Sequence, residues 1–217
     1  MGPVWGTIGT MVRRPLATAV AAALLAALLL PALGRAEDEV GVGLPAPGFS
    51  AKTLNPEAAG AGWIRLDQYA GDEPDDAGAR VVLLSFFASW CGPCQKELPF
   101  LVQLDRMYRD QGLRVVSVSI DTAPEGIETC RRQAADAKVV HPVVSDRYNL
   151  IARRYLGEET KLPSVFLVGR DGNVLRIERG YAKDAAAFLM GEVQQALGVK
   201  PAKAAAASPA VPAAIKR

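Results

Sequence analysis

One junction near the middle of the chain limits its fold more than any other feature. Residues 80–87 form an almost continuous apolar run of strand length, which is typical of a strand covered on both faces. Cys91 and Cys94 follow directly. Beyond them, apolar residues recur at helical spacing: Phe100, Leu101, Leu104, Met107 and Tyr108, with Gly112 as a stop signal. The pattern predicts a buried strand that leads into a long helix, with both cysteines at the junction.

Strand-like and helix-like segments alternate around this junction. Strands are predicted at 49–54, 63–66, 113–120, 139–144, 164–168 and 174–179, and helices at about 125–137, 148–155 and 184–197. The last two strands are separated by Arg170-Asp-Gly-Asn173, a turn sequence that predicts an antiparallel hairpin. Together these segments predict an α/β fold, a three-layer sandwich whose central mixed β-sheet carries helices on both faces.

The first 36 residues have the pattern of an export signal. Arg13 and Arg14 precede an apolar run over residues 16–33, and Gly34-Arg35-Ala36 places small residues where a signal peptidase cuts. The segment is predicted to be a cleaved signal peptide, with an uncleaved membrane anchor through residues 16–33 as the alternative. Either form predicts that the rest of the chain works in the periplasm or an equivalent extracytoplasmic compartment.

The remaining chain divides into one domain and a tail. Residues 37–197 are sufficient for one hydrophobic core, whereas residues 198–217 are rich in Ala, Pro and Lys and are predicted to be disordered. All 23 acidic residues lie in the domain, together with only 18 of the basic ones. This balance argues against a nucleic-acid-binding surface, which needs clustered basic side chains.

The spacing of Cys91 and Cys94 favours chemistry over structural cross-linking. A disulfide across two intervening residues closes a very short loop and adds little stability. At the start of a helix, free backbone amides stabilise a thiolate, so Cys91 is the predicted nucleophile and Cys94 the resolving thiol. Gly92 permits close approach of another backbone, and Pro93 suits a first helical turn. The expected reaction is attack on a disulfide, formation of a mixed disulfide and release by the second thiol.

Two other roles are open to the cysteines. A zinc site would need Cys130 and His141 as further ligands, but their spacing fits no compact zinc motif. A purely structural disulfide is the second alternative. We expect no metal and no cofactor. Cys130 is predicted to be a small buried residue, and His141 an ordinary structural residue before a proline.

The segment Phe86-Phe-Ala-Ser-Trp-Cys-Gly-Pro-Cys94 resembles the active site of the thioredoxin superfamily. Further segments are similar to landmarks of its exported TlpA/ResA-like branch: Val42–Phe49, Ile64–Tyr69, Cys94–Pro99, His141–Asp146 and Leu162–Phe166. The resemblance covers about residues 40–197 and implies a thioredoxin-like form of the predicted sandwich. Members of that branch reduce extracytoplasmic protein disulfides, including those of apocytochromes before haem attachment. Protein thiols and disulfides are therefore the implied substrates, and a membrane protein the implied electron donor.

The resemblance also implies roles in substrate binding. Pro163 matches the cis-proline that lies beside the active-site sulfurs, and the backbone of Leu162 would hydrogen-bond an extended substrate. Trp90 would shield the sulfurs and contact substrate, together with Gly92 and Pro93. A plain packing role is the alternative for Trp90.

Glu97 matches an acidic residue held below the cysteines in this branch. A buried carboxyl there would have a raised pKa and could carry the proton of Cys94. The alternative is a solvated helical acid. Ser85 stands where cytoplasmic thioredoxins carry a buried aspartate, so proton transfer is expected to depend more on Glu97.

Two functions from other classes stay open. A copper chaperone of related fold would use both thiolates and a histidine, although such proteins usually separate the cysteines by three residues. A thiol peroxidase would share the fold, but its reactive cysteine normally follows a threonine-containing loop, which Ala88-Ser89-Trp90 does not supply.

Overall fold

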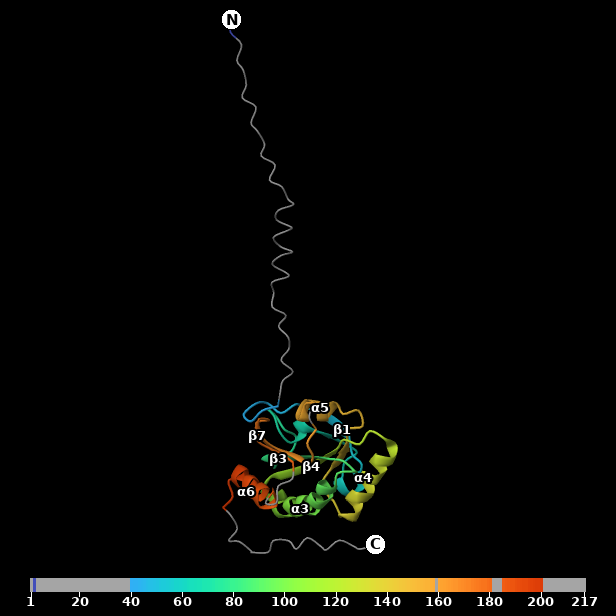
Figure 1. The fold of residues 1–217 in the computed structure, drawn as a ribbon. Coiled ribbons are helices and arrows are strands. Elements are labelled where there is room, and N and C mark those ends of the chain that lie inside the picture. Colours follow the sequence, from blue (N-terminus) through green and yellow to red (C-terminus); the bar gives the residue numbers. More distant parts are fainter. Residues whose placement is uncertain (1, 3–39, 159, 181–184, 201–217) are drawn as a thin grey trace. The chain divides into compact units, whose positions relative to one another are not determined.

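A computed structural model describes residues 2, 40–158, 160–180 and 185–200 (Figure 1). Apart from Gly2, the predicted leader lies outside the described residues, as do Asp184, expected to cap the last helix, and the tail from residue 201. Within the described ranges, no helix has both the length and the apolar character needed to cross a membrane.

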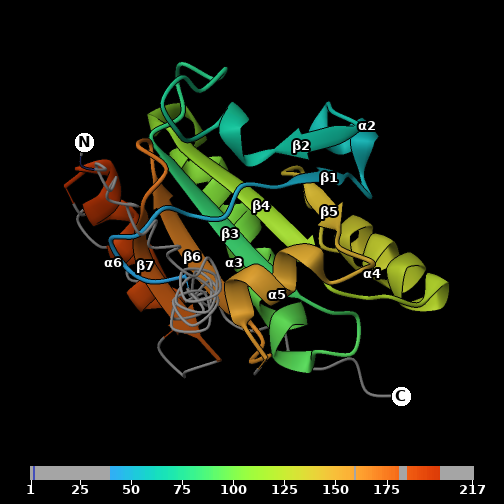
Figure 2. The same ribbon diagram turned by 90° about the horizontal axis from the view of Figure 1, so that it is seen from above.

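A mixed sheet forms the centre of the domain. Its strands are β3 (Val81–Phe87), β4 (Leu113–Ser119), β5 (Val143–Ser145), β6 (Ser164–Gly169) and β7 (Val174–Arg179). Figure 2 shows them side by side in the order β5-β4-β3-β6-β7. The pairs β3–β4 and β4–β5 are parallel, whereas β3–β6 and β6–β7 are antiparallel, so the predicted hairpin is confirmed. Every side chain of β3 is buried, as predicted for this strand.

Helices cover both faces of the sheet. They are α3 (Gly92–Tyr108), α4 (Pro124–Asp136), α5 (Leu150–Leu156) and α6 (Ala185–Leu197), with the short 3-10 helix η2 (Arg109–Gln111) after α3. In Figure 1, α3 and α6 lie on one side of the sheet and α5 lies on the other. The three-layer α/β sandwich predicted from the sequence is confirmed.

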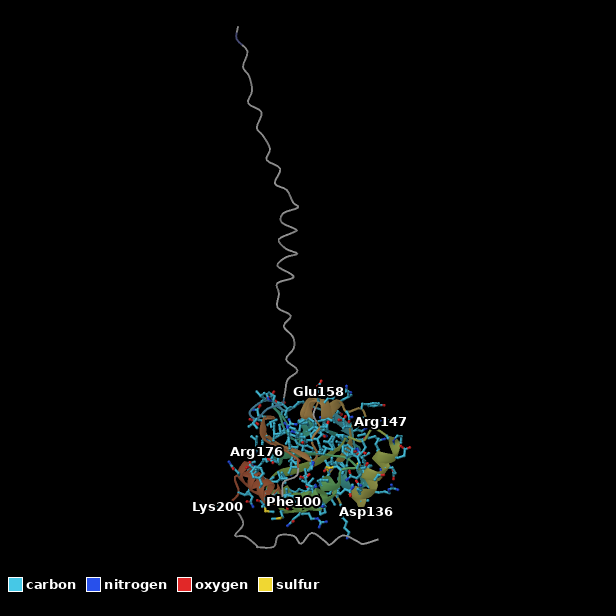
Figure 3. The ribbon with its side chains drawn as sticks, viewed as in Figure 1. Phe100, Asp136, Arg147, Glu158, Arg176 and Lys200 are labelled. Carbon is cyan, nitrogen blue, oxygen red and sulfur yellow. A yellow bond between two sulfur atoms is a disulfide. The ribbon has the colours of Figure 1, made fainter. Side chains whose placement is uncertain are left out.

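Alternate side chains of β3 enter two separate hydrophobic cores, because successive strand residues point to opposite faces. Val81 and Leu83 pack in the core that α3 and α6 line with Leu101, Leu104, Leu189 and Val193. Leu84 and Phe86 pack in the core that α4 and α5 line with Cys130, Ala134, Ile151 and Tyr155. Figure 3 shows Phe100 on α3 and Glu158 just after α5 on opposite sides of the sheet.

A small hairpin precedes the central strand and is joined to the sheet edge. It consists of β1 (Ser50–Lys52), α2 (Pro56–Ala59), β2 (Trp63–Arg65) and the 3-10 helix η1 (Leu66–Gln68). Thr53 forms an isolated bridge with Val144 of β5. Asn55 donates a hydrogen bond to the His141 carbonyl and accepts one from the Val143 N–H, which fixes the hairpin against β5.

One expectation from the sequence is wrong in detail. The strand predicted from Val139 begins only at Val143, because Lys138 adopts a positive φ of 55° and the Val139 N–H turns back to the Ala134 carbonyl. Met107, one of the apolar residues that recur at helical spacing, is 40% exposed. The spacing of apolar residues alone predicts neither the turn at Lys138 nor the exposed side of α3 at Met107.

Candidate active site

Cys91 and Cys94 form a disulfide at the N-terminus of α3, with their Cα atoms 5.3 Å apart. Cys91 is the N-cap of the helix, and its sulfur accepts a hydrogen bond from the Cys94 N–H at 3.2 Å. Both cysteines are buried within the protein, but Gly92 and Pro93 between them are exposed. The cysteines therefore lie just below an open surface of the domain.

The local electrostatics favour a thiolate at position 91. The first turn of α3 contains no acidic residue, and its backbone N–H groups lack partners within the helix. Those groups and the helix dipole place partial positive charge beside the Cys91 sulfur, which favours its ionised and nucleophilic form. A Cβ placed on Gly92 would meet no atom of the chain within 4 Å, so the surface beside the disulfide is open to another molecule.

Glu97 lies one helical turn after Cys94 and faces the sheet. It is only 9% exposed, and its carboxylate accepts a hydrogen bond from the Ser85 hydroxyl at 3.0 Å. Burial raises the pKa of Glu97 from an ordinary 4.5 to about 7, and the hydrogen bond from Ser85 offsets this only in part. The solvated-acid alternative is therefore wrong for this side chain. Ser85 stands where cytoplasmic thioredoxins carry a buried aspartate, and here it donates a hydrogen bond to the Glu97 carboxylate.

Glu97→Gln is expected to change how stability depends on pH. Between about pH 4.5 and 7 the folded protein holds the Glu97 proton while the unfolded chain releases it, so this residue makes stability fall as the pH rises. Compared with Glu97→Gln, the wild type should lose up to about 3 kcal/mol of unfolding free energy across this window. Urea unfolding of both proteins below and above the window measures the difference. An equal pH dependence in the two proteins would contradict the burial argument.

The pairing of β3 with β6 places Leu162 and Pro163 near the active site. Phe86 of β3 pairs with Ser164 of β6, so the residue before Ser164 lies where β3 ends and the cysteine loop begins. The Leu162–Pro163 peptide bond is cis, as the resemblance implied, and the Pro163 side chain is buried. The structure thus brings this bond to the same edge of the sheet as the cysteine pair.

Trp90 lies on the surface directly before the nucleophile. It is 70% exposed, which excludes the packing role considered for it. A pocket of about 470 Å³ opens beside it, lined by Ser89, Trp90, Ile120, Asp121, Thr122, Ala123, Gly126, Asn149 and Thr160. The pocket combines an exposed indole with hydroxyl and amide groups, which suits contact with a polypeptide.

Sequence reasoning missed a polar cluster below the cysteine loop. Asp121 accepts hydrogen bonds from the N–H and hydroxyl of Ser89, at 2.8 and 2.6 Å, and from the Cys130 thiol at 2.9 Å. Cys130 is fully buried, as expected, but it is a hydrogen-bond donor and not only an apolar side chain. One available signal was the position of Asp121, two residues after β4, beside the end of β3.

His141 is fully buried and hydrogen-bonded within the domain. Its Nε2 lies 2.9 Å from the Ser117 hydroxyl, and burial lowers its pKa to about 3, so the ring is neutral. This agrees with the structural role predicted for it. In the part of the chain that the structure describes, no three His, Cys, Asp or Glu side chains are grouped to hold a metal ion.

Comparison with known proteins gives a consistent classification. The AhpC/TSA family model matches residues 42–177. The thiol-disulfide oxidoreductase ResA of Geobacillus thermodenitrificans is 29% identical over 162 residues, which cover 70% of this chain and 82% of that protein. The thioredoxin-like protein YneN of Bacillus subtilis is 32% identical over 118 residues, covering 54% of this chain and 61% of that protein.

Solved structures agree with this classification. A crystal structure of a proposed thiol:disulfide interchange protein DsbE from Chlorobium tepidum is 27% identical, with a TM-score of 0.61, and covers 74% of this chain and 100% of that one. A second thioredoxin family protein from Chlorobium tepidum, 23% identical with a TM-score of 0.57, supports the fold; that match covers 73% of this chain and 99% of the other. With its cysteine pair at the start of α3, the chain belongs to the AhpC/TSA family and is a thiol–disulfide oxidoreductase of thioredoxin-like fold.

Proposed function

We propose that the protein is an extracytoplasmic reductant of protein disulfides. The single observation that carries this proposal is the placement of Cys91 as N-cap of α3, with Cys94 behind it and buried Glu97 one turn further on. The helix N-terminus at Cys91 stabilises a thiolate, and Cys94 can supply the resolving thiol.

The proposed reaction transfers two electrons from the dithiol to the substrate. The Cys91 thiolate attacks one sulfur of a substrate disulfide, forming an intermolecular S–S bond and releasing a substrate thiolate, which takes up a proton. Cys94 then loses its proton and attacks the Cys91 sulfur, which releases the second substrate thiolate. The enzyme ends as the Cys91–Cys94 disulfide and the substrate as a dithiol.

Glu97 is the proposed acceptor of the Cys94 proton. It is the buried carboxyl one turn along the same helix, and its pKa of about 7 places its titration near neutral pH. The Ser85 hydroxyl donates a hydrogen bond to the carboxylate and so gives the acid a defined orientation.

The proposed location and partners rest on the sequence of the leader and on the relatives. The Arg13-Arg14 pair and the apolar run over residues 16–33 support export, through a cleaved signal or a retained anchor. Outside the cytoplasm a reductant needs an electron supply, so a membrane thiol–disulfide protein is the proposed donor. ResA relatives are named thiol-disulfide oxidoreductases. Apocytochromes whose CxxCH cysteines must be reduced before haem attachment are the proposed substrates.

A Cys94→Ala variant tests the reaction and identifies the substrate. Without the resolving thiol, the mixed disulfide with Cys91 should accumulate in cells and be recovered by non-reducing purification. Capture of an apocytochrome supports haem-attachment service, and capture of many exported proteins would point to general disulfide repair. The Cys91→Ala/Cys94→Ala double variant is the control. Equal recovery from both variants, or none from either, would contradict the proposal.

The two other functions are separated by direct assays. Copper(I) titration of the reduced protein tests the chaperone alternative, against which stands the buried position of His141 and its bond to Ser117. Peroxide added to the reduced protein tests the peroxidase alternative. Oxidation of Cys91 at the rate of an ordinary thiol would remove that alternative.

A further inference from the structure

Every polar group of Ser89 forms a hydrogen bond, although this residue lies in the loop before the nucleophile. Its N–H and hydroxyl donate to Asp121. Its carbonyl accepts from the side-chain amides of Gln95 on α3, at 3.0 Å, and Gln133 on α4, at 3.1 Å. The next residue, Trp90, is largely exposed, so its orientation depends on the backbone of Ser89. Two residues after Ser89 comes the attacking sulfur of Cys91.

Strand register explains why Asp121 reaches this loop. Phe87 and Ser119 are paired at the ends of the parallel strands β3 and β4, and the Ile120 N–H donates to the Phe87 carbonyl. Ser89 and Asp121, each two residues beyond the end of its strand, lie opposite one another. The carboxylate therefore continues the cross-strand contact beyond the last backbone pair, where the backbone of β3 turns toward the cysteines.

The hydrogen-bond donors and acceptors in this cluster are matched. Burial alone raises the pKa of Asp121, but hydrogen bonds from Cys130 and Ser89 outweigh it and hold the pKa below its ordinary value. Burial and the neighbouring Asp121 raise the pKa of Cys130 to about 12, so its thiol keeps its proton. Cys130 is thus a neutral donor to an ionised acceptor, and the Ser119 oxygen lies 3.3 Å from both the Asp121 carboxylate and the Cys130 sulfur.

The helix α4 leaves room for the carboxylate only because residue 126 is glycine. A Cβ at Gly126 would lie 2.5 Å from Asp121 Oδ1 and 3.2 Å from its Cγ. The carboxylate is held from three sides by this helix, β4 and the cysteine loop, so it has little freedom to relax if Gly126 gains a side chain.

We propose that Asp121, supported by the Cys130 thiol, is a positioning residue that fixes Ser89 and thereby the orientation of Cys91 and Trp90 for attack on the substrate disulfide. In this role the third cysteine acts without being oxidised. The activity readout of this role rests on the proposed function, but the reactivity of the Cys91 thiol tests the role separately.

The test measures two rates on each reduced variant of the full chain. One is alkylation of Cys91 by iodoacetamide at about pH 6, and the other is kcat/KM for a peptide disulfide. Asp121→Ala should lower kcat/KM by about ten- to a hundredfold, because misplacing a reacting group by about 1 Å costs that much. It should also slow alkylation, because the Cys91 sulfur moves away from the amide groups that stabilise its thiolate. Asp121→Asn still accepts from the Ser89 N–H and should restore most of the loss. Asp105→Asn, a buried carboxyl held by Arg109 at the other end of α3, is the matched control and should leave both rates unchanged.

A second pair of variants tests the thiol and does not depend on Asp121→Ala folding. Cys130→Ala removes the donor to Asp121 and should slow both rates, whereas Cys130→Ser keeps a donor and should stay near the wild type. Gly126→Ala should slow both rates through its contact with Asp121. Wild-type rates in a folded Asp121→Ala, or in both Cys130→Ala and Gly126→Ala, would overturn the inference. If the wild type itself reduces no disulfide, the proposed function fails while the alkylation rates still decide this role.

Discussion

Replacing Cys91 by serine is expected to lower disulfide reductase activity by at least about a thousandfold, the scale on which loss of a nucleophile acts. A serine hydroxyl at the start of α3 is not ionised near neutral pH, so the helix N-terminus has no thiolate to stabilise. Reduction of a disulfide-containing protein such as insulin, followed by turbidity, measures the effect. The fold should be retained, because the cysteine pair closes a very short loop and contributes little to stability.

Cys130→Ser is the natural control for this experiment. It removes the third thiol but keeps a hydrogen-bond donor to Asp121, so activity should stay near that of the wild type. Residual activity in Cys91→Ser above that of a Cys91→Ser/Cys94→Ser variant would show that Cys94 can attack substrates directly. That result would contradict the assignment of the two sulfurs.

Glu97→Gln is expected to slow turnover about a hundredfold above pH 7, in the range that general acid–base catalysis contributes. Only the deprotonated carboxylate can accept the Cys94 proton, so activity of the wild type should rise as the pH passes through about 7 and then level off. Glutamine keeps the Ser85 hydrogen bond but cannot take up a proton, so this rise should be absent from the variant. Stopped-flow measurement of the mixed disulfide separates its formation from its resolution.

The effect of Glu97→Gln should lie in the second step alone. Formation of the mixed disulfide should proceed at the wild-type rate, and its resolution should be slow. Glu128→Gln, which removes an exposed carboxylate paired with Arg131 on α4, is the matched control and should change neither step. A variant that slowed formation and resolution equally would show that Glu97 acts on the shape of the site and not on the proton of Cys94.

The sequence was sufficient to predict the sandwich and the redox pair because their signals are local. The apolar run of β3, the cysteine spacing and the helical pattern that follows lie within about thirty consecutive residues, and each has one dominant structural reading. The hairpin of β6 and β7 was predictable for the same reason, since its turn sequence lies between two short strands.

The polar contacts of the site could not be predicted, because they depend on register between distant segments. Ser85 reaches Glu97 across the space between β3 and α3, and Asp121 reaches Ser89 across 32 residues of sequence. The resemblance to the family showed that position 85 lacks an aspartate. Only the structure showed that the serine there donates a hydrogen bond to Glu97. The start of the strand predicted at Val139 was wrong for a similar reason, because the positive φ of Lys138 leaves no signal in the hydrophobic pattern.

Alkylation of the reduced protein at about pH 6 tests the central claim most directly. If the amide groups that open α3 stabilise a thiolate, Cys91 should react with iodoacetamide at least about tenfold faster than a cysteine in an unstructured peptide, and Cys94 should not. Mass spectrometry of the digested protein assigns the modified sulfur. Reaction of both sulfurs at the rate of the peptide cysteine, or slower, would contradict the account.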